Sequence, residues 1–325
     1  MKTLLKVFGI AVLAIVALAA IGVSYLSLRK PAQRPAAAIR IEPTPERVAR
    51  GKYLVRHVGL CLDCHSERKL SYALPFNLEH EGARGLVWNK EIGFPGTLAA
   101  ANLTPDPATG LGKWTDGEIL RAIREGVDRD GNALFPIMPY AHLRSLSDDD
   151  AYAIVAYLRT LKPVHYAKPK KSLQLPLNFV EKFMPEPITA PVPPPDRSNS
   201  VAYGKYLVTV ASCAECHTPH DSHDAPIKGM EFAGGWEMHA PTFKVRTANI
   251  TPHPSTWVGR ATREEFIGRF AAFRNFDASQ APQTDGRNTL MPWISFSGMT
   301  DEDLGAIYDY LKTIKPIAND VRPWG

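Results

Sequence analysis

The segment Cys61-Leu62-Asp63-Cys64-His65 recurs later in the chain as Cys213-Ala214-Glu215-Cys216-His217, and these two copies contain all four cysteines. Two thiols at this spacing lie on one turn of a helix, where each can add to a vinyl group of one haem. The histidine that follows is then placed to bind the iron. The sequence therefore predicts two covalently bound haem c groups, whose attachment sites and iron-binding histidines are Cys61, Cys64, His65, Cys213, Cys216 and His217.

Zinc and redox-disulfide sites use related cysteine patterns, but they fit this chain less well. A structural zinc ion needs four thiol or imidazole ligands, so half of each site would have to come from elsewhere in the sequence. A thioredoxin-like redox pair is expected beside a βαβ pattern, which this sequence lacks. The histidine directly after each cysteine pair favours haem.

A methionine is the expected second protein ligand of each iron. Met138 follows His65 by 73 residues, Met291 follows His217 by 74 residues, and both methionines precede a proline. The thioether is a soft ligand that suits haem iron, and ligation by histidine and methionine raises the reduction potential. An isolated methionine more often only fills a core, but the matched placement favours ligation. We predict the metal ligands His65, Met138, His217 and Met291, and no catalytic residues.

Neighbouring polar groups are expected to support the two sites. The Nδ1 atom of each ligating histidine should donate to a carbonyl, and a repeated Asn-x-Thr-Pro tetrapeptide offers those of Pro105 and Pro252. Arginine, tryptophan and amide side chains are typical donors to haem propionates. The candidates are Arg84, Trp88, Asn102 and Asn249. His142 and His253 are alternative distal ligands.

The haem motifs belong to a longer internal repeat. A Gly-Lys-Tyr-Leu-Val segment, the Asn-x-Thr-Pro tetrapeptide and a segment ending in Lys-Pro each occur twice in the same order, at residues 51–55 and 204–208, 102–105 and 249–252, and 157–163 and 310–316. We interpret this order as a duplication with one haem per copy. The expected division is a membrane segment (1–30), a tether (31–43), a first haem domain (44–165), a proline-rich linker (166–199) and a second haem domain (200–325).

Both copies contain the signals of helices rather than of sheets. The expected N-cap residues are Thr44, Thr115, Ser147, Thr262 and Thr300. Two of them are followed by glutamate at the spacing of a capping box, at residues 115–118 and 262–265. Pro163 and Pro316 are expected to end the last helix of each copy. The predicted fold class is all-α, with long loops.

Two further expectations concern packing. Gly51 and Gly204 should allow the first and last helices of each copy to cross closely. The linker contains apolar side chains that should lie over the domain surfaces, because they would otherwise be exposed to water. They are Leu173, Leu175, Leu177, Phe179, Val180 and Phe183.

A bilayer-length apolar run lies near the N-terminus. No charged residue occurs from Val7 to Leu28, about 33 Å as a helix, which is enough for the hydrocarbon core of a bilayer. An uncleaved anchor is favoured over a cleaved signal, because the run continues past the cleavage-like Ala17-Leu18-Ala19. Flanking charges do not decide the orientation. Bacteria attach haem to such motifs on the periplasmic side, so we expect one anchor in the inner membrane and both haem domains in the periplasm.

The net charge of +5 arises outside the two expected domains. Residues 1–40 contain six basic and no acidic side chains. By contrast, residues 41–165 contain 15 basic and 16 acidic side chains, and residues 201–325 contain 12 and 14. Because both expected domains are slightly acidic, a nucleic-acid partner is not expected.

The chain resembles class I c-type cytochromes, and it is most similar to the multihaem cytochrome c subunits of bacterial membrane-bound alcohol and sugar dehydrogenases. Besides the haem motifs, the resemblance rests on residues 51–55, on residues 102–105 with Trp114, and on residues 135–140. It covers about residues 44–165 and 200–316. Those subunits usually carry three haem motifs, whereas this chain has two. The resemblance implies two tandem class I cytochrome c domains after an N-terminal transmembrane helix.

Electron transfer is the predicted function. If histidine and methionine occupy both axial positions, neither iron has an open coordination site for a substrate. We therefore predict a dihaem cytochrome rather than an enzyme. This cytochrome relays single electrons from a dehydrogenase or quinol-oxidising complex to another cytochrome or a terminal oxidase. One alternative is a dihaem cytochrome c peroxidase, which needs an open distal face on one haem. The other is the cytochrome subunit of an alcohol or sugar dehydrogenase complex.

Overall fold

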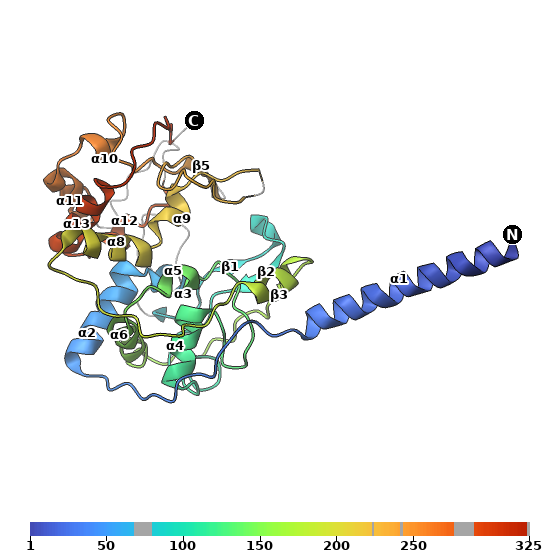
Figure 1. Cartoon of the computed structure of the whole chain (residues 1–325). Coiled ribbons are helices and arrows are strands. Elements are labelled where there is room, and N and C mark those ends of the chain that lie inside the picture. Colours follow the sequence, from blue (N-terminus) through green and yellow to red (C-terminus); the bar gives the residue numbers. More distant parts are fainter. Residues whose placement is uncertain (68–79, 223, 241–242, 276–288, 324–325) are drawn as a thin grey trace.

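The computed structural model describes residues 1–67, 80–222, 224–240, 243–275 and 289–323. Helices dominate these residues, as predicted. They are α1 (Lys2–Leu28), α2 (Pro45–Tyr53), the π-helical η1 (Leu54–Val58), α3 (Cys61–His65), the 3-10 helix η3 (Lys90–Ile92), α4 (Asp116–Glu125), α5 (Tyr140–Leu143), α6 (Asp148–Leu158), α7 (Leu177–Val180), the 3-10 helix η4 (Glu181–Phe183), α8 (Ser200–Val210), α9 (Cys213–His217), α10 (Trp257–Arg260), α11 (Arg263–Ala271), α12 (Trp293–Ser297) and α13 (Asp301–Leu311). Figure 1 shows α1 extending away from the rest of the molecule.

Short strands accompany the helices. Two antiparallel pairings join β1 (Val87–Trp88), β2 (Gly96–Ala99) and β3 (Ser172–Leu173), with Val87 opposite Ala99 and Gly96 opposite Leu173. A second antiparallel pair consists of β4 (Glu237–Ala240) and β5 (Phe243–Arg246). The sequence indicated these strands only weakly, because each contains at most four residues.

Two helix crossings organise the core around the haem motifs. α2 packs against α6, and α8 packs against α13, so that the helix before each motif meets the last helix of the same copy. The crossings are close because a Cβ on Gly51 would lie 1.8 Å from the carbonyl oxygen of Ala153, and a Cβ on Gly204 would lie 1.8 Å from that of Ala306. The predicted role of both glycines is confirmed.

Gly51→Ala and Gly204→Ala are each expected to lower the free energy of unfolding by about 3 kcal/mol or more, at the upper end of overpacking costs, because the added methyl group meets backbone. Gly268→Ala in α11 is the matched control, since a Cβ there has nothing within 4 Å. It should be neutral or should stabilise by up to about 1 kcal/mol. Denaturant titration of the three variants measures the difference. Equal stabilities for all three would contradict the close crossing.

The predicted N-caps are confirmed, whereas the predicted helix ends are not. The side chains of Thr44, Ser147 and Thr300 each accept a backbone N–H in the first turn of a helix. Capping boxes form at residues 115–118 and 262–265. However, α6 ends at Leu158 and α13 at Leu311, before the prolines expected to end them. Both helices finish in tighter turns, in which the N–H of Thr160 donates to Tyr157 and that of Thr313 to Tyr310.

The linker is only partly covered, which corrects the expectation for its apolar side chains. It is attached to the first half through β3 and through a hydrogen bond from the N–H of Asp148 to the carbonyl of Val192 (2.9 Å). Leu175, Val180 and Phe183 nevertheless remain 70%, 46% and 52% exposed. The hydrophobic character of these residues did not distinguish a buried linker from one that presents an apolar surface.

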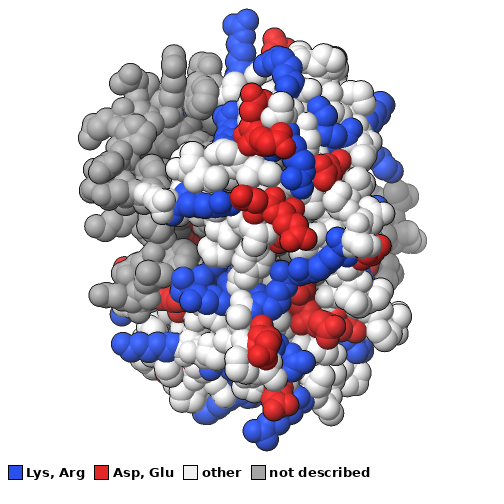
Figure 2. All heavy atoms as spheres, turned by 90° about the vertical axis from the view of Figure 1, so that its left-hand side faces the viewer, with Lys and Arg blue, Asp and Glu red and all other residues white. Residues whose placement is uncertain are grey.

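Charged side chains of both signs alternate on the face that carries the left-hand helices of Figure 1. Figure 2 shows lysines and arginines interspersed with acidic residues there, among the residues that the structure describes. Ion pairs among the described residues include Arg50 with Asp150 (2.8 Å) and Arg274 with Asp301 (2.6 Å). The described part of this face thus lacks the single-sign field typical of a nucleic-acid surface.

Candidate haem-binding sites

Each cysteine motif forms one short helical turn with the same entry geometry. α3 begins after Leu60 and α9 after Ser212, and both preceding residues have left-handed backbone angles, with φ of 49° and 54°. Because the two cysteines of each motif are three residues apart on a helical turn, their side chains lie on one face. Both sites therefore present two thiols and one imidazole from a single turn.

The first cysteine of each motif lies in apolar surroundings. Burial raises the pKa of Cys61 to about 12, and it does the same for Cys213. Redox-active cysteines usually have a lowered pKa, so these surroundings do not favour a reactive thiolate. Both thiols also pack against the hydrophobic core, as a thioether to a buried apolar group would.

The histidine of the first motif is fixed by a backbone carbonyl. His65 Nδ1 lies 2.8 Å from the carbonyl oxygen of Ala101, and only 9% of the residue is exposed. Burial lowers the pKa of His65, which favours the neutral imidazole that binds metals. With Nδ1 engaged as the donor, Nε2 is the nitrogen left to bind iron.

The second histidine has the same arrangement. His217 Nδ1 lies 2.7 Å from the carbonyl oxygen of Ala248, and burial again lowers its pKa. The N–H of Gly234 donates to the carbonyl of His217 (2.6 Å), which places this glycine directly against the motif. Two thiols and an oriented imidazole on one helical turn are the donor set that covalently bound haem requires, so the residues present fit that cofactor.

The predicted carbonyl partners of the histidines are wrong. The acceptors belong to Ala101 and Ala248, not to Pro105 and Pro252. An alanine immediately precedes the repeated Asn-x-Thr-Pro tetrapeptide in both copies. The acceptor residue could therefore have been found in the sequence, because it belongs to the repeat and lies one residue before the tetrapeptide.

The asparagines of the tetrapeptide connect two parts of each copy instead of offering donors to propionates. Asn102 Nδ2 donates to the carbonyl of Val164 (2.8 Å) and to Thr109 Oγ1 (3.1 Å). In the second copy, Asn249 Nδ2 donates to the carbonyls of Ile317 (2.9 Å) and Asn319 (3.2 Å). Because both amide hydrogens are used in each case, the expectation that these residues bind propionates is corrected. Their role is to hold the loop against the chain that follows the last helix.

The two methionines occupy equivalent positions at the start of short helices. Met138 precedes α5 and Met291 precedes α12, with a proline at the N-cap in both cases. The N–H of the residue two positions on, Tyr140 or Trp293, donates to the methionine carbonyl (2.8 Å). Both side chains are half-buried and pack against the core. Ligation of iron by these methionines stays a prediction.

The alternative distal ligands have other contacts. His253 Nδ1 lies 2.7 Å from Ser255 Oγ. His142 Nε2 forms a short contact with Glu215, the residue between the cysteines of the second motif. Hydrogen bonding to His142 lowers the pKa of Glu215. Because both histidines are engaged elsewhere, Met138 and Met291 remain the favoured ligands. The His142–Glu215 contact also joins α5 to α9.

A reciprocal pair of tyrosine contacts links the two copies, and the sequence analysis missed it. Tyr53 Oη donates to Asp303 Oδ2 (2.6 Å), and Tyr206 Oη donates to Asp150 Oδ2 (2.6 Å). Both tyrosines are the third residue of the Gly-Lys-Tyr-Leu-Val segment, and both aspartates are the third acid of the last helix. Each hydroxyl also accepts the N–H of the other copy's N-cap residue, Ser147 or Thr300. The contact is therefore symmetric within the chain.

The aspartate in the first copy is ionised by its neighbours. Arg50 donates two hydrogen bonds to Asp150, both of 2.8 Å, in addition to the bond from Tyr206. Burial opposes ionisation, but these hydrogen bonds and the guanidinium charge outweigh it and lower the pKa of Asp150. A buried and charged acceptor makes the loss of a donor costly.

Tyr53→Phe and Tyr206→Phe are each expected to lower the free energy of unfolding by about 1–3 kcal/mol, because each leaves a buried carboxylate without one donor. Tyr53→Phe should have the larger effect, because Asp150 keeps two hydrogen bonds from Arg50 whereas Asp303 keeps a longer one from Tyr203 (3.3 Å). Tyr166→Phe removes a hydroxyl outside these contacts and should change stability by less than about 0.5 kcal/mol. Urea titration of the haem-loaded protein gives all three values. An effect of the tyrosine variants no larger than that of Tyr166→Phe would contradict a stabilising contact between the copies.

Comparison with known proteins points to one family. Residues 201–315 match the cytochrome c family. The chain is 32% identical over 285 residues to the alcohol dehydrogenase (quinone) cytochrome c subunit of Gluconacetobacter polyoxogenes, covering 83% of this chain and 56% of that protein. It is 29% identical over 280 residues to the gluconate 2-dehydrogenase cytochrome c subunit of Pantoea cypripedii, covering 82% and 59%.

A third relative is closer in length. The chain is 29% identical over 228 residues to a diheme cytochrome c-type protein of Cereibacter sphaeroides, covering 68% of this chain and 73% of that protein. By contrast, the chain spans little more than half of the dehydrogenase subunits that it matches.

Proposed function

We propose that this chain is the membrane-anchored dihaem electron-transfer subunit of a periplasmic dehydrogenase system. Two findings support this role: residues 201–315 match the cytochrome c family, and the chain is related to cytochrome c subunits of dehydrogenases. It passes single electrons from the dehydrogenase, or from a quinol-oxidising complex, to another cytochrome or a terminal oxidase. The observation that carries this proposal is the repeated Cys-x-x-Cys-His turn whose histidine Nδ1 is held by an alanine carbonyl in both copies.

The proposed organisation is two haem domains, at residues 44–165 and 200–325, joined by the linker at 166–199. The equivalent crossings of α2 with α6 and of α8 with α13 support it. So do the matched capping boxes and the matched histidine acceptors. Each domain would hold one haem.

Each proposed site is built from one turn and one distant methionine. Cys61 and Cys64 hold the first haem covalently, and His65 and Met138 bind its iron. The second site uses the equivalent Cys213, Cys216, His217 and Met291. When bound, haem c supplies an iron that gains or loses one electron. The carbonyls of Ala101 and Ala248 keep the imidazole rings oriented, and Cys61 and Cys213 pack against the hydrophobic core.

Saturated coordination favours electron transfer over peroxide chemistry. If His65 and Met138 bind one iron and His217 and Met291 bind the other, neither site would have a position left for peroxide. The matched geometry of the turns at Met138 and Met291 supports equal ligation in the two domains, whereas a peroxidase requires one different site.

The contacts between the copies give the relay its fixed geometry. The Tyr53–Asp303 and Tyr206–Asp150 hydrogen bonds hold the helices that precede the two motifs. The His142–Glu215 contact connects the segment after Met138 with the second haem turn. A fixed arrangement allows electrons to pass between the two sites without domain movement.

Anchoring by α1 completes the proposal. This helix has 27 residues, and its most apolar 18-residue window has a mean hydropathy of 2.7 and no buried residues, so it is long and apolar enough to cross a membrane. An uncleaved anchor with its N-terminus in the cytoplasm places both haem domains in the periplasm, where haem is attached to such motifs.

Affinity purification of the full chain from native membranes, followed by a haem-stained gel, tests the proposal. We expect a haem-stained band at the mass of the full chain, together with a co-purifying dehydrogenase or quinol-oxidising complex. A chain that stains for haem but is recovered in the soluble fraction would contradict the anchor. Purification without any redox partner, after mild detergent extraction and cross-linking, would contradict the subunit role.

A further inference from the structure

The linker presents an exposed apolar surface at one place. This surface, called here the linker face, comprises Leu175, Val180, Phe183 and Met184, which are 70%, 46%, 52% and 46% exposed. It lies on and around α7 and η4. Apolar side chains that gather on a surface in this way usually mark a contact with a partner or a lipid phase.

The opposite side of the same segment is fixed to the protein. Both carboxylate oxygens of Glu181 lie 2.9 Å from Lys171 Nζ, and Glu181 is only 6% exposed. Lys171 Nζ also donates to the carbonyl of Ala133 (3.0 Å) in the first half. The segment is therefore held in place on its polar side, with its apolar side turned outward.

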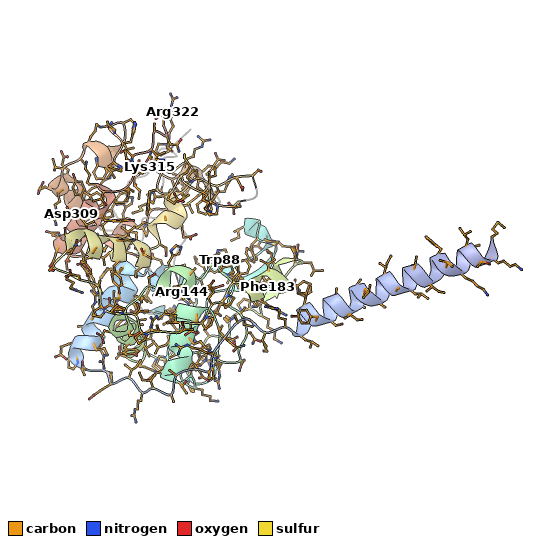
Figure 3. All side chains as sticks on the ribbon, in the orientation of Figure 1. Trp88, Arg144, Phe183, Asp309, Lys315 and Arg322 are labelled. Atoms are coloured by element: carbon orange, nitrogen blue, oxygen red, sulfur yellow. The ribbon has the colours of Figure 1, made fainter. Side chains whose placement is uncertain are left out.

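The linker face lies at the end of the bilayer-length helix. Lys182 Nζ donates to the carbonyls of Leu26 (2.9 Å) and Ser27 (2.7 Å), which belong to the last turn of α1. The guanidinium carbon of Arg29 lies 4.4 Å from the centre of the Phe183 ring. Figure 3 shows Phe183 where α1 meets the globular part of the molecule.

We propose that the linker face inserts into the headgroup and upper acyl region of the periplasmic leaflet, as a second membrane contact beside α1. This inference rests on the proposed function, because it requires α1 to span the bilayer. If α1 spans it, the end at Leu28 lies at the membrane surface, and the segment bound to that end must lie there too.

The surrounding charges fit a lipid surface. Lys182 and Arg29 lie next to the apolar side chains, with Arg29 over the Phe183 ring and Lys182 beside Phe179. Cations at the edge of an apolar surface interact favourably with phosphate headgroups. A short amphipathic segment with aromatic and aliphatic side chains on one side and cations at its edge is typical of an interfacial contact. The contact would fix the tilt of the haem-bearing part relative to the membrane, which α1 alone does not.

Photo-cross-linking in native membranes tests this contact and identifies its partner. The photoreactive amino acid p-benzoylphenylalanine is placed in the full chain at Phe183 or Leu175. Two control positions are Ile227, an apolar residue after the second haem motif that is 40% exposed, and Leu13 in α1, which is 70% exposed. Mass spectrometry of the irradiated chain distinguishes phospholipid adducts from protein adducts.

Phospholipid adducts at positions 183, 175 and 13, with none at 227, are the expected result. Lipid adducts at position 13 without any at 183 and 175 would overturn the linker-face contact and leave the anchor intact. A protein adduct at 183 and 175 would assign the surface to a partner subunit and also overturn the inference. Absence of lipid adducts at position 13 would contradict the anchor, and the linker-face contact would fall with it.

Discussion

A chain carrying both Cys61→Ala and Cys64→Ala is expected to contain one covalently bound haem instead of two, and the chain with Cys213→Ala and Cys216→Ala should also contain one. The reason is that each motif supplies both thioether attachments of its own haem from one helical turn. Removing all four cysteines should abolish covalent haem. Alkaline pyridine spectra normalised to protein concentration, together with the intact mass of the chain, measure the number of covalently bound haems per chain.

Thr209→Ala is the matched control for these variants. Its hydroxyl makes only a local bond to the carbonyl of Lys205, one turn before the second motif, so the variant should retain two haems. Two haems in either double-cysteine variant would contradict the assignment of the sites. The two double variants check each other, because a folding defect in one copy should leave the haem of the other copy attached.

Replacing Met138 or Met291 with alanine should strongly change the absorption spectrum and the reduction potential of the affected haem. Each change removes one proposed axial ligand, so the far-red methionine–iron band of the ferric protein should fall by about half in each single variant and disappear in the double variant. The reduction potential of the affected haem should decrease, because loss of a thioether removes a ligand that stabilises ferrous iron. The decrease should be a sizeable fraction of the roughly 0.8 V range that axial ligands control.

Met230→Ala is the control, since this methionine has no counterpart in the first copy. It should leave both the far-red band and the two potentials unchanged. Spectroelectrochemical titration of the four proteins measures all of these quantities. A far-red band that persists in the double variant would show that other residues bind the iron.

Local interactions explain what could be predicted from the sequence. A capping box depends on residues three positions apart, so residues 115–118 and 262–265 were identifiable without the fold. The glycine roles were also predictable, because Gly51 recurs as Gly204 within one repeated segment. The cysteine motif is similarly local, since one turn contains both thiols and the histidine.

Interactions between distant segments explain what was missed. The carbonyls that hold His65 and His217 lie 36 and 31 residues away, and their identity depends on how each loop returns to the motif. The contacts of Tyr53 and Tyr206 depend on how one copy packs against the other, which the repeat pattern does not encode. Exposure of Phe183 depends on the position of α1, about 150 residues earlier in the chain.

The central claim is that both irons have two protein ligands and carry electrons without binding a substrate. The most direct test is the spectrum of the fully reduced, two-haem protein before and after addition of carbon monoxide, which binds ferrous haem only at an open or easily opened axial position. We predict an unchanged spectrum at neutral pH. A carbon monoxide complex on one haem, together with turnover of peroxide by the reduced protein, would contradict the claim and favour a peroxidase.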